Sequence, residues 1–293
     1  MTSFTLGDIP DMTGRTVVVT GANSGIGRAT AAALAERGAR VVLAVRDERK
    51  GRAAAAAMAG HTEVRRLDLA DLASVRAFAR DFTDPLDLLV NNAGVTVPSL
   101  ARTADGFERQ FGTNHLGHFA LTNLLLPRLR GRVVTVSSLA HLMGSIDFAD
   151  LNWHRRGYRA YPAYAQSKLA NLLFADELSR RLAAAASPVV STAAHPGIAA
   201  TNLVNEAGGR TLRFRLEKAL MGAVAHSARA GALPTLCAAV AEVPSGGYIG
   251  PRRLMGMRGA PAPARRAASA RDADTARRLW RVSEELTGTA FPL

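Results

Sequence analysis

The chain has very little cysteine, few aromatic residues and no long apolar run. Cys237 is its single cysteine, which excludes an intrachain disulfide and a cysteine-ligated zinc cluster and gives no reason to expect an oxidising compartment. Residues 1–13 lack the charged start and apolar run of a signal peptide, and no apolar stretch of about eighteen residues is free of proline or charge. We therefore expect a cytoplasmic protein without a membrane span.

Lysine is scarce as well, although basic residues outnumber acidic ones. The 293 residues include 37 Lys and Arg against 24 Asp and Glu, a formal net charge of +13, but the only lysines are Lys50, Lys168 and Lys218. The arginines are spread along the chain, without interleaved aromatic residues or a nucleic-acid-binding motif. This distribution favours a solvated basic surface, and we expect no nucleic-acid partner.

The hydrophobic residues, 48% of the chain, are sufficient for a large core and exclude disorder. Short apolar, β-branched runs predict strands over residues 16–20, 40–45, 63–67, 87–90, 132–137, 188–194 and 247–249. Helical patterns between and after them cover residues 26–37, about 46–59, 71–81, 104–129, 161–185 and 272–286. The alternation predicts an α/β fold, a doubly wound parallel sheet (Rossmann fold) of about seven strands with helices on both faces. We expect one domain over 1–293, with a core of about 14–250 and an Arg-rich C-terminal extension, 251–293.

A glycine-rich turn follows the first predicted strand and opens the first predicted helix. Its sequence, residues 20–27, is TGANSGIG. A helix N-terminus offers unpaired N–H groups and partial positive charge to a pyrophosphate. Gly21 permits the tight turn, Gly25 lets the backbone approach the phosphates, and Gly27 lets helix and strand pack closely. A generic turn is the alternative reading of three glycines, but the order strand, turn, helix favours a dinucleotide site.

Four motifs together resemble those of the short-chain dehydrogenase/reductase family. They are TGANSGIG at 20–27, NNAG at 91–94, YAQSK at 164–168 and PGIAAT at 196–201, in the family's order. The resemblance covers about residues 14–250, and the segments 134–141, 146–161 and 248–251 look closest to the retinol-dehydrogenase-like and protochlorophyllide-reductase-like branch. It implies a nicotinamide dinucleotide in contact with Gly21, Asn23, Ser24, Gly25, Ile26, Gly27, Asp68, Leu69, Asn92, Ala93, Gly94, Lys168, Pro196, Gly197, Ile198 and Thr201.

The end of the second predicted strand bears on the choice of nucleotide. In dinucleotide-binding folds an acidic residue there bonds the ribose 2′-hydroxyl, whereas an arginine accommodates a 2′-phosphate. Here Val45 occupies the usual aspartate position and Arg46 follows it, which favours NADP over NAD. Asp47 could instead pair with Arg46 or reach the ribose. Asp68, which the resemblance places near the adenine, is on physical grounds equally well a cap or turn residue.

The catalytic group that the resemblance implies is Tyr164, Lys168, Ser138 and Asn114. Tyr164 and Lys168 are four residues apart, so a helix places them on one face, where the ammonium is expected to lower the phenol's pKa. Ser138 would stabilise a substrate oxygen, with Ser137 as the alternative. Asn114 lies in a predicted helix, where asparagine is an unfavourable residue. The resemblance implies that it holds a water molecule that takes part in a proton relay. By itself it would be a surface residue.

The activity implied is hydride transfer between NADP(H) and a small-molecule alcohol or carbonyl compound. Apolar residues after Pro196 favour a lipophilic substrate, although they could equally pack a lid helix: Leu203, Val204, Leu212, Phe214, Leu216, Leu220 and Met221. A catalytically silent dinucleotide-binding sensor or scaffold is the alternative function. The family's usual pairing of two long helices (here about 104–129 and 161–185) predicts a homodimer, an expectation that the extra segment 146–161 weakens. His115 and His118 lack a third ligand, so packing is favoured over a metal site.

Overall fold

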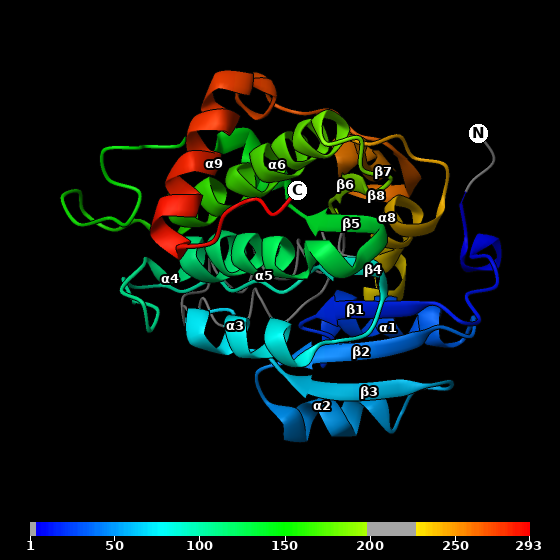
Figure 1. The fold of residues 1–293 in the computed structure, drawn as a ribbon. Helices are drawn as coiled ribbons and strands as arrows, with labels where there is room; N and C mark the ends of the chain where they lie inside the picture. The colour runs from blue at the N-terminus through cyan, green and yellow to red at the C-terminus, as the bar shows by residue number, and fades with distance from the viewer. Residues whose placement is uncertain (1–3, 198–226) are drawn as a thin grey trace, which may run out of the picture.

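The computed structural model describes residues 4–197 and 227–293, and within them eight strands form one sheet (Figure 1). The strands are β1 (Thr16–Thr20), β2 (Arg40–Val45), β3 (Thr62–Arg66), β4 (Leu86–Asn91), β5 (Leu129–Val136), β6 (Val190–Ala194), β7 (Tyr248–Arg253) and β8 (Arg258–Pro263). Their order is β3-β2-β1-β4-β5-β6-β7-β8. The pairs from β3 to β7 are parallel, and β8 pairs with β7 antiparallel. The doubly wound fold predicted from the sequence is confirmed.

Helices cover both faces of this sheet. They are α1 (Gly25–Ala35), α2 (Glu48–Ala55), α3 (Leu72–Asp81), α4 (Arg109–Phe111), α5 (Gly117–Leu125), α6 (Ala160–Ala184), α8 (Ala228–Val240) and α9 (Ala273–Thr287). Short helical turns add η1 (Leu6–Asp8), η2 (Gly112–Leu116), η3 (Leu126–Arg128), η4 (Leu139–Met143), η6 (Leu254–Gly256) and η7 (Ala268–Arg271). One core cluster joins the sheet to α3, α5, α6 and α9, and the other joins it to α1, α2 and α8.

The interiors of β1 and β2 are apolar, as parallel strands buried on both faces require. Val17, Val18 and Val19 have no exposed surface. Helix α6 is buried on nearly all sides from Ala165 to Ala175, because the sheet lies beneath it and α9 packs across it. The carboxyl ends of β1, β4 and β5 therefore meet at one edge of a rigid core, which is where the candidate residues of the sequence gather.

The predicted helix over 104–129 is the main error in the sequence-based elements. Residues 104–108 form a turn with Gly106 at φ +86°, and the helix begins at Arg109 after Glu108, whose carboxylate accepts the Gln110 and Phe111 N–H groups at 2.9 and 2.7 Å. Helix α4 then passes through the π-helical turn η2 before α5 begins. The apolar periodicity could not reveal where this helix begins, because its start is set by one buried carboxylate and a tertiary contact.

The C-terminal segment is built into the core. Strand β7 runs through residue 250, the expected end of the core, and β8 adds an eighth strand that the sequence analysis did not predict. Helix α9 is capped by Asp272 and packs across α5 and α6 (Figure 1). It buries one stripe of residues: Ala276, Leu279, Trp280, Ser283 and Thr287. This helix packs on both of the long helices that the predicted homodimer was expected to pair.

Candidate active site

The glycine-rich turn has the backbone that the sequence predicts. Gly21 and Gly25 have φ of +66° and +54°, a region that favours glycine. A Cβ on Gly27 would lie 2.3 Å from Asn92 Nδ2 and 2.6 Å from the Gly21 carbonyl oxygen, so only glycine fits there. Ser24 precedes α1 without capping it through its side chain, which leaves the first N–H groups of the helix to an anion. This turn fits a pyrophosphate.

Thr20 joins this turn to the NNAG segment. Its hydroxyl oxygen accepts the N–H groups of Asn92 and Ala93, both at 2.9 Å, and its carbonyl oxygen accepts Asn92 Nδ2 at 2.8 Å. His118 lies below, with its ring nitrogens 2.9 Å from Thr20 Oγ1 and from the Asn114 carbonyl oxygen. Burial lowers the pKa of His118 to about 4, so the ring is neutral at pH 7.

The end of β2 presents one cation at the predicted position. Val45 is buried, whereas Arg46 is exposed and has no ion pair among the residues that the structure describes. Asp47 is otherwise engaged, because its carboxylate accepts the Lys50 N–H at 3.1 Å and caps α2. Asp68 makes a turn in which Oδ1 accepts the Ala70 N–H at 3.0 Å. Leu69, also predicted as a contact, is buried against Gly117.

Tyr164 and Lys168 lie on one face of α6, beside the loop after β5. The Lys168 ammonium is 5.6 Å from the centre of the Tyr164 ring, and the Tyr164 hydroxyl interacts with the Ser138 side chain. Lys168 Nζ donates to the Val136 carbonyl oxygen at 3.3 Å, its one hydrogen bond among the described residues. Because an ammonium has three N–H donors, the remaining two are left for ligand hydroxyl groups or water.

The expected direction of the Tyr164 pKa is wrong for the protein alone. Burial raises the pKa of Tyr164 to about 12, and the interaction with Ser138 only partly opposes it. The same burial lowers the pKa of Lys168 to about 8. Desolvation penalises both charged forms, and at this separation it exceeds the stabilisation of a phenolate by the ammonium. Tyr164 is therefore protonated at neutral pH.

The structure separates the two neighbouring serines. Ser137 is 2% exposed, and its hydroxyl donates to the Lys168 carbonyl oxygen at 2.7 Å, which ties β5 to α6. Ser138 begins η4, where its Oγ accepts the Ala140 N–H at 3.2 Å while the side chain remains partly exposed beside Tyr164. Ser138 is thus the serine that can reach a bound substrate.

Asn114 is placed by the π-helical turn and is completely buried. Its Oδ1 accepts the Val95 N–H at 2.8 Å, and its Nδ2 donates to the Val95 carbonyl oxygen at 3.1 Å and to Ser167 Oγ at 3.0 Å. A Cβ on Gly94 would lie 3.3 Å from Lys168 Nζ and 3.5 Å from Asn114 Oδ1, so a space without a side chain separates these groups. Single-turn π insertions are frequent at functional sites.

The loop after β6 enters the site through Gly197, which has φ +72°. Its N–H donates to His195 Nδ1 at 3.2 Å, so His195 shapes this loop. Ile198, Thr201 and the apolar residues expected to bind substrate lie outside the described residues. The extra segment 146–161 is anchored by Tyr158, whose hydroxyl donates to Glu108 Oε1 at 3.1 Å. Glu108 and His141 are buried polar residues that no local pattern of the sequence marks.

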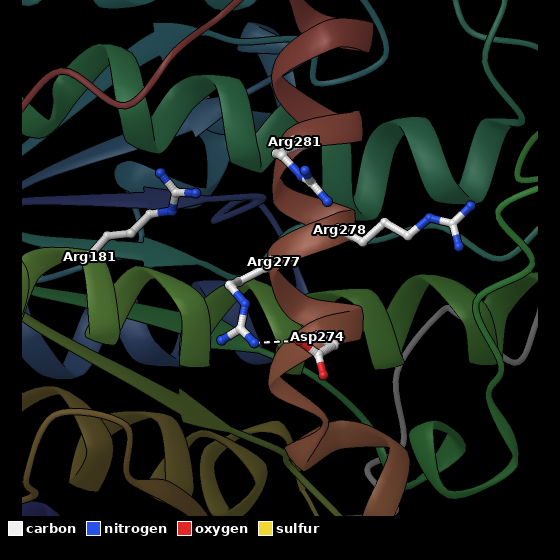
Figure 2. Close-up of a pocket in the computed structure, with 5 residues that line it drawn as sticks. All are labelled: Arg181, Asp274, Arg277, Arg278 and Arg281. Atoms are coloured by element: carbon white, nitrogen blue, oxygen red, sulfur yellow. Dashed lines mark hydrogen bonds and ion pairs between the residues drawn. The ribbon is translucent and has the colours of Figure 1, made fainter.

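One surface pocket lies away from these residues, between α6 and α9. It encloses about 400 Å³ and is lined by Arg181, Asp274, Arg277, Arg278 and Arg281. Arg181 is 17 residues beyond Tyr164 on α6, or about 25 Å along the helix axis. Figure 2 shows the guanidinium groups of Arg181 and Arg278 on opposite sides of α9, so they do not converge on one ligand. No helix among the described residues is long and apolar enough to cross a membrane.

Comparison with known proteins agrees with this geometry. The family model of the short chain dehydrogenase matches residues 15–210. Retinol dehydrogenase 13 of Homo sapiens is 45% identical over 95% of this chain and 86% of its own length, and polyprenol dehydrogenase of Mus musculus is 45% identical over 96% and 86%. The crystal structure of an uncharacterized protein from Mycobacterium paratuberculosis covers all of both chains at 53% identity, with a TM-score of 0.88.

These matches define the class of the protein first and then its branch. The chain belongs to the short-chain dehydrogenase family, as the four motifs predicted. Within that family it is a member of the retinol-dehydrogenase-like branch, and it is an oxidoreductase of the class that acts on alcohol or carbonyl groups with a nicotinamide dinucleotide.

Proposed function

We propose that the protein transfers a hydride between NADP(H) and a lipophilic alcohol or carbonyl compound. The observation that carries the proposal is the meeting of Tyr164, Lys168 and Ser138 beside the space over Gly94. The nicotinamide, when bound, supplies or accepts the hydride. Every other task falls to the side chains around that space.

Each side chain has a role that its surroundings support. Tyr164 is protonated at neutral pH, which is the state that a proton donor to a carbonyl oxygen needs, so its raised pKa supports the reductive direction. Ser138 would donate a hydrogen bond to the same oxygen as negative charge develops on it. Lys168 would use its two free N–H donors on the nicotinamide ribose and on water. Asn114 would fix the backbone at Val95 through its two hydrogen bonds and would orient that water.

The preference for NADP rests on the end of β2. Arg46 is exposed at the predicted 2′ position, and Asp47, the one neighbouring carboxylate, is engaged as the cap of α2. A guanidinium bonds a phosphate bidentately, and no carboxylate in Val45's place repels it. We therefore propose NADP as the cofactor and NAD as the weaker ligand.

A lipophilic substrate is supported by apolar side chains at the rim. Leu142 and Met143, which follow Ser138 in η4, are 53% and 75% exposed. Leu254 and Met255 of η6 are 58% and 91% exposed, and η6 contacts η4 where a Cβ on Gly256 would lie 3.3 Å from Leu139. Exposed apolar groups that cluster around a site favour an apolar ligand. The relatives named for retinol and polyprenol act on alcohols of this kind.

The test is Tyr164→Phe, assayed with NADPH and a panel of carbonyl compounds from short aldehydes to retinoids and steroids. We expect wild-type turnover of at least one lipophilic member and a loss of about 10²–10⁴-fold in the variant, with unchanged NADPH affinity. Wild-type activity in Tyr164→Phe would refute the mechanism. Strong NADPH binding with no turnover of any compound by the wild type would favour the silent sensor instead.

The homodimer remains a proposal that needs another surface. Helix α9 packs on α5 and α6, and Trp280 lies between Phe119 and Phe174 at ring distances of 4.9 and 5.6 Å. A partner could not pair with the same helix face without displacing α9. Sedimentation of the full chain, with Trp280 as a fluorescence probe, tests whether a dimer forms while α9 stays in place.

A further inference from the structure

The serine loop (residues 138–144) is held from below by one histidine. His141 is completely buried, and its Nδ1 lies 2.7 Å from the Ser138 carbonyl oxygen. Its Nε2 lies 3.4 Å from the backbone nitrogen of Ala267, in the segment that leads to α9. One imidazole therefore bridges the loop that carries Ser138 and a segment 126 residues further along the chain.

The two partners determine the protonation state of this imidazole. The Ser138 carbonyl can only accept a hydrogen bond, and the Ala267 N–H can only donate one. His141 is therefore neutral, with its proton on Nδ1. Burial lowers the pKa of His141, and although the bond to Ser138 opposes this, the nearby Arg266 lowers it further, in agreement with a neutral ring. A neutral ring in a fixed orientation can hold the loop without adding a charge next to the site.

A second histidine acts in parallel across Tyr248 of β7. The Tyr248 ring is 5.8 Å from that of His141, at 86°, and 5.3 Å from that of His195. His195 Nδ1 accepts the Gly197 N–H at 3.2 Å, so His195 fixes the glycine loop while His141 fixes the serine loop. The Arg266 guanidinium lies 5.6 Å from the Tyr248 ring centre on the C-terminal side. Both loops of the site thus rest on one aromatic side chain.

We infer that His141 is a positioning residue for Ser138, and that the C-terminal segment around Ala267 completes the active site through it. The inference rests on the proposed function. Ser138 Oγ accepts the Ala140 N–H, which directs its own hydroxyl proton away from Ala140. His141 fixes the Ser138 carbonyl on the other side of the same residue. The serine can then present its O–H to a substrate oxygen without a search among rotamers.

A double-mutant cycle tests whether His141 acts through Ser138. We expect His141→Phe to lower kcat by about 10–100-fold and to leave the NADPH dissociation constant unchanged, because the glycine-rich turn is not touched. In the Ser138→Ala background the same change should cost less than about threefold, since the group it positions is gone. Costs that multiply in the double variant would overturn the inference, because they would show that His141 acts independently of Ser138.

Two conservative variants and one distant control sharpen the cycle. His141→Asn keeps a donor near the Ser138 carbonyl and should recover most of the lost kcat, whereas His141→Gln keeps an acceptor toward Ala267 and should not. Equal losses in the two variants would contradict the role assigned to the Ser138 contact. His61→Phe, at an exposed site outside the machinery, should match the wild type.

Amide exchange and histidine ¹⁵N spectra of the ligand-free protein test the role of His141 without any substrate. We expect a neutral Nδ1–H histidine signal from His141, beside that of His118, that disappears in His141→Phe. The Ala140 and Ala267 amides should exchange faster in that variant. Unchanged exchange at Ala140 would overturn the inference even if catalysis is as proposed. If the wild type reduces no compound of the panel, the proposed function fails, and these spectra still decide whether His141 holds the loop.

Discussion

The two halves of the sheet hold their functional residues by contacts of different range. In the first half (residues 16–91), Asp47 bonds the Lys50 N–H, Asp68 the Ala70 N–H and Asp71 the Ala73 N–H. In the second half (residues 129–197 and 227–293), His141 reaches Ala267, and Arg132 reaches the Ala238 carbonyl, 106 residues away. His115, between the halves, reaches Ser283 of α9. Residues fixed by local turns can be predicted from sequence, whereas residues fixed by distant contacts, among them Thr20 of the first half with Asn92, cannot.

The largest effect should come from removing the anchor of α9. Trp280 is 2% exposed, stacks on Phe174 and lies 4.5 Å from the Arg181 guanidinium. We expect Trp280→Ala to lower the free energy of unfolding by about 3–5 kcal/mol, measured by urea denaturation. NADPH affinity of the folded variant should stay unchanged, since the glycine-rich turn is distant. An unchanged free energy of unfolding would mean that α9 contributes little to the second half.

Gly27→Ala should instead weaken cofactor binding by the first half. The new Cβ would meet Asn92 Nδ2 and the Gly21 carbonyl, so α1 must move away from the turn. We expect NADPH affinity to fall by about 100-fold, measured by fluorescence titration. Gly157→Ala is the matched control, because its Cβ would meet nothing within 4 Å. Equal affinities for the two variants would remove the turn from the cofactor site.

Arg46→Asp should change which nucleotide the first half prefers. A carboxylate there repels a 2′-phosphate and can bond a 2′-hydroxyl instead. We expect the dissociation constant for NADPH to rise by at least about tenfold, while that for NADH changes little or falls. Arg49→Asp, at an exposed position three residues further on, serves as the control for general charge. Equal weakening of both nucleotides would contradict the assignment of NADP.

Buried histidines between the halves and in the second half should make the protein acid-sensitive. Burial lowers the pKa of His115 to about 3, and of His118 and His195 to about 4, from an ordinary value of 6.5. As pH falls below 6.5 the unfolded chain binds protons that the folded protein does not. Each histidine should then lower the free energy of unfolding by about 1.4 kcal/mol per pH unit down to about pH 4.

Urea denaturation at pH 7, 6 and 5 measures this slope directly. Above pH 5 the carboxylates contribute little, so the histidines should dominate it. In His115→Phe the slope should fall by about one proton, and the loss of the 2.9 Å bond to Ser283 should appear as a pH-independent offset. A free energy of unfolding that is equal at pH 7 and pH 5 would mean that these imidazoles are not neutral in the fold.

Much of the fold follows from the sequence for physical reasons that act over a few residues. The strands β1 and β2 match their predicted bounds, and Asp71 and Asp272, where two helical patterns were predicted to begin, cap α3 and α9. Apolar runs, glycine at positive φ and carboxylates at helix starts act on their immediate neighbours, so their pattern is visible without the fold. The family's motifs extended this reading to the site.

The tertiary structure alone decided the features that depend on distant partners or on burial. It moved the start of the helix predicted over 104–129 to Arg109, after Glu108, placed Asn114 in a π-helical turn, and separated Ser138 from Ser137. It also raised the pKa of Tyr164, because the cost of charging a group depends on the atoms that the whole fold brings around it. A sequence determines which local structures are favourable; which groups lose their water is decided only when distant segments pack together.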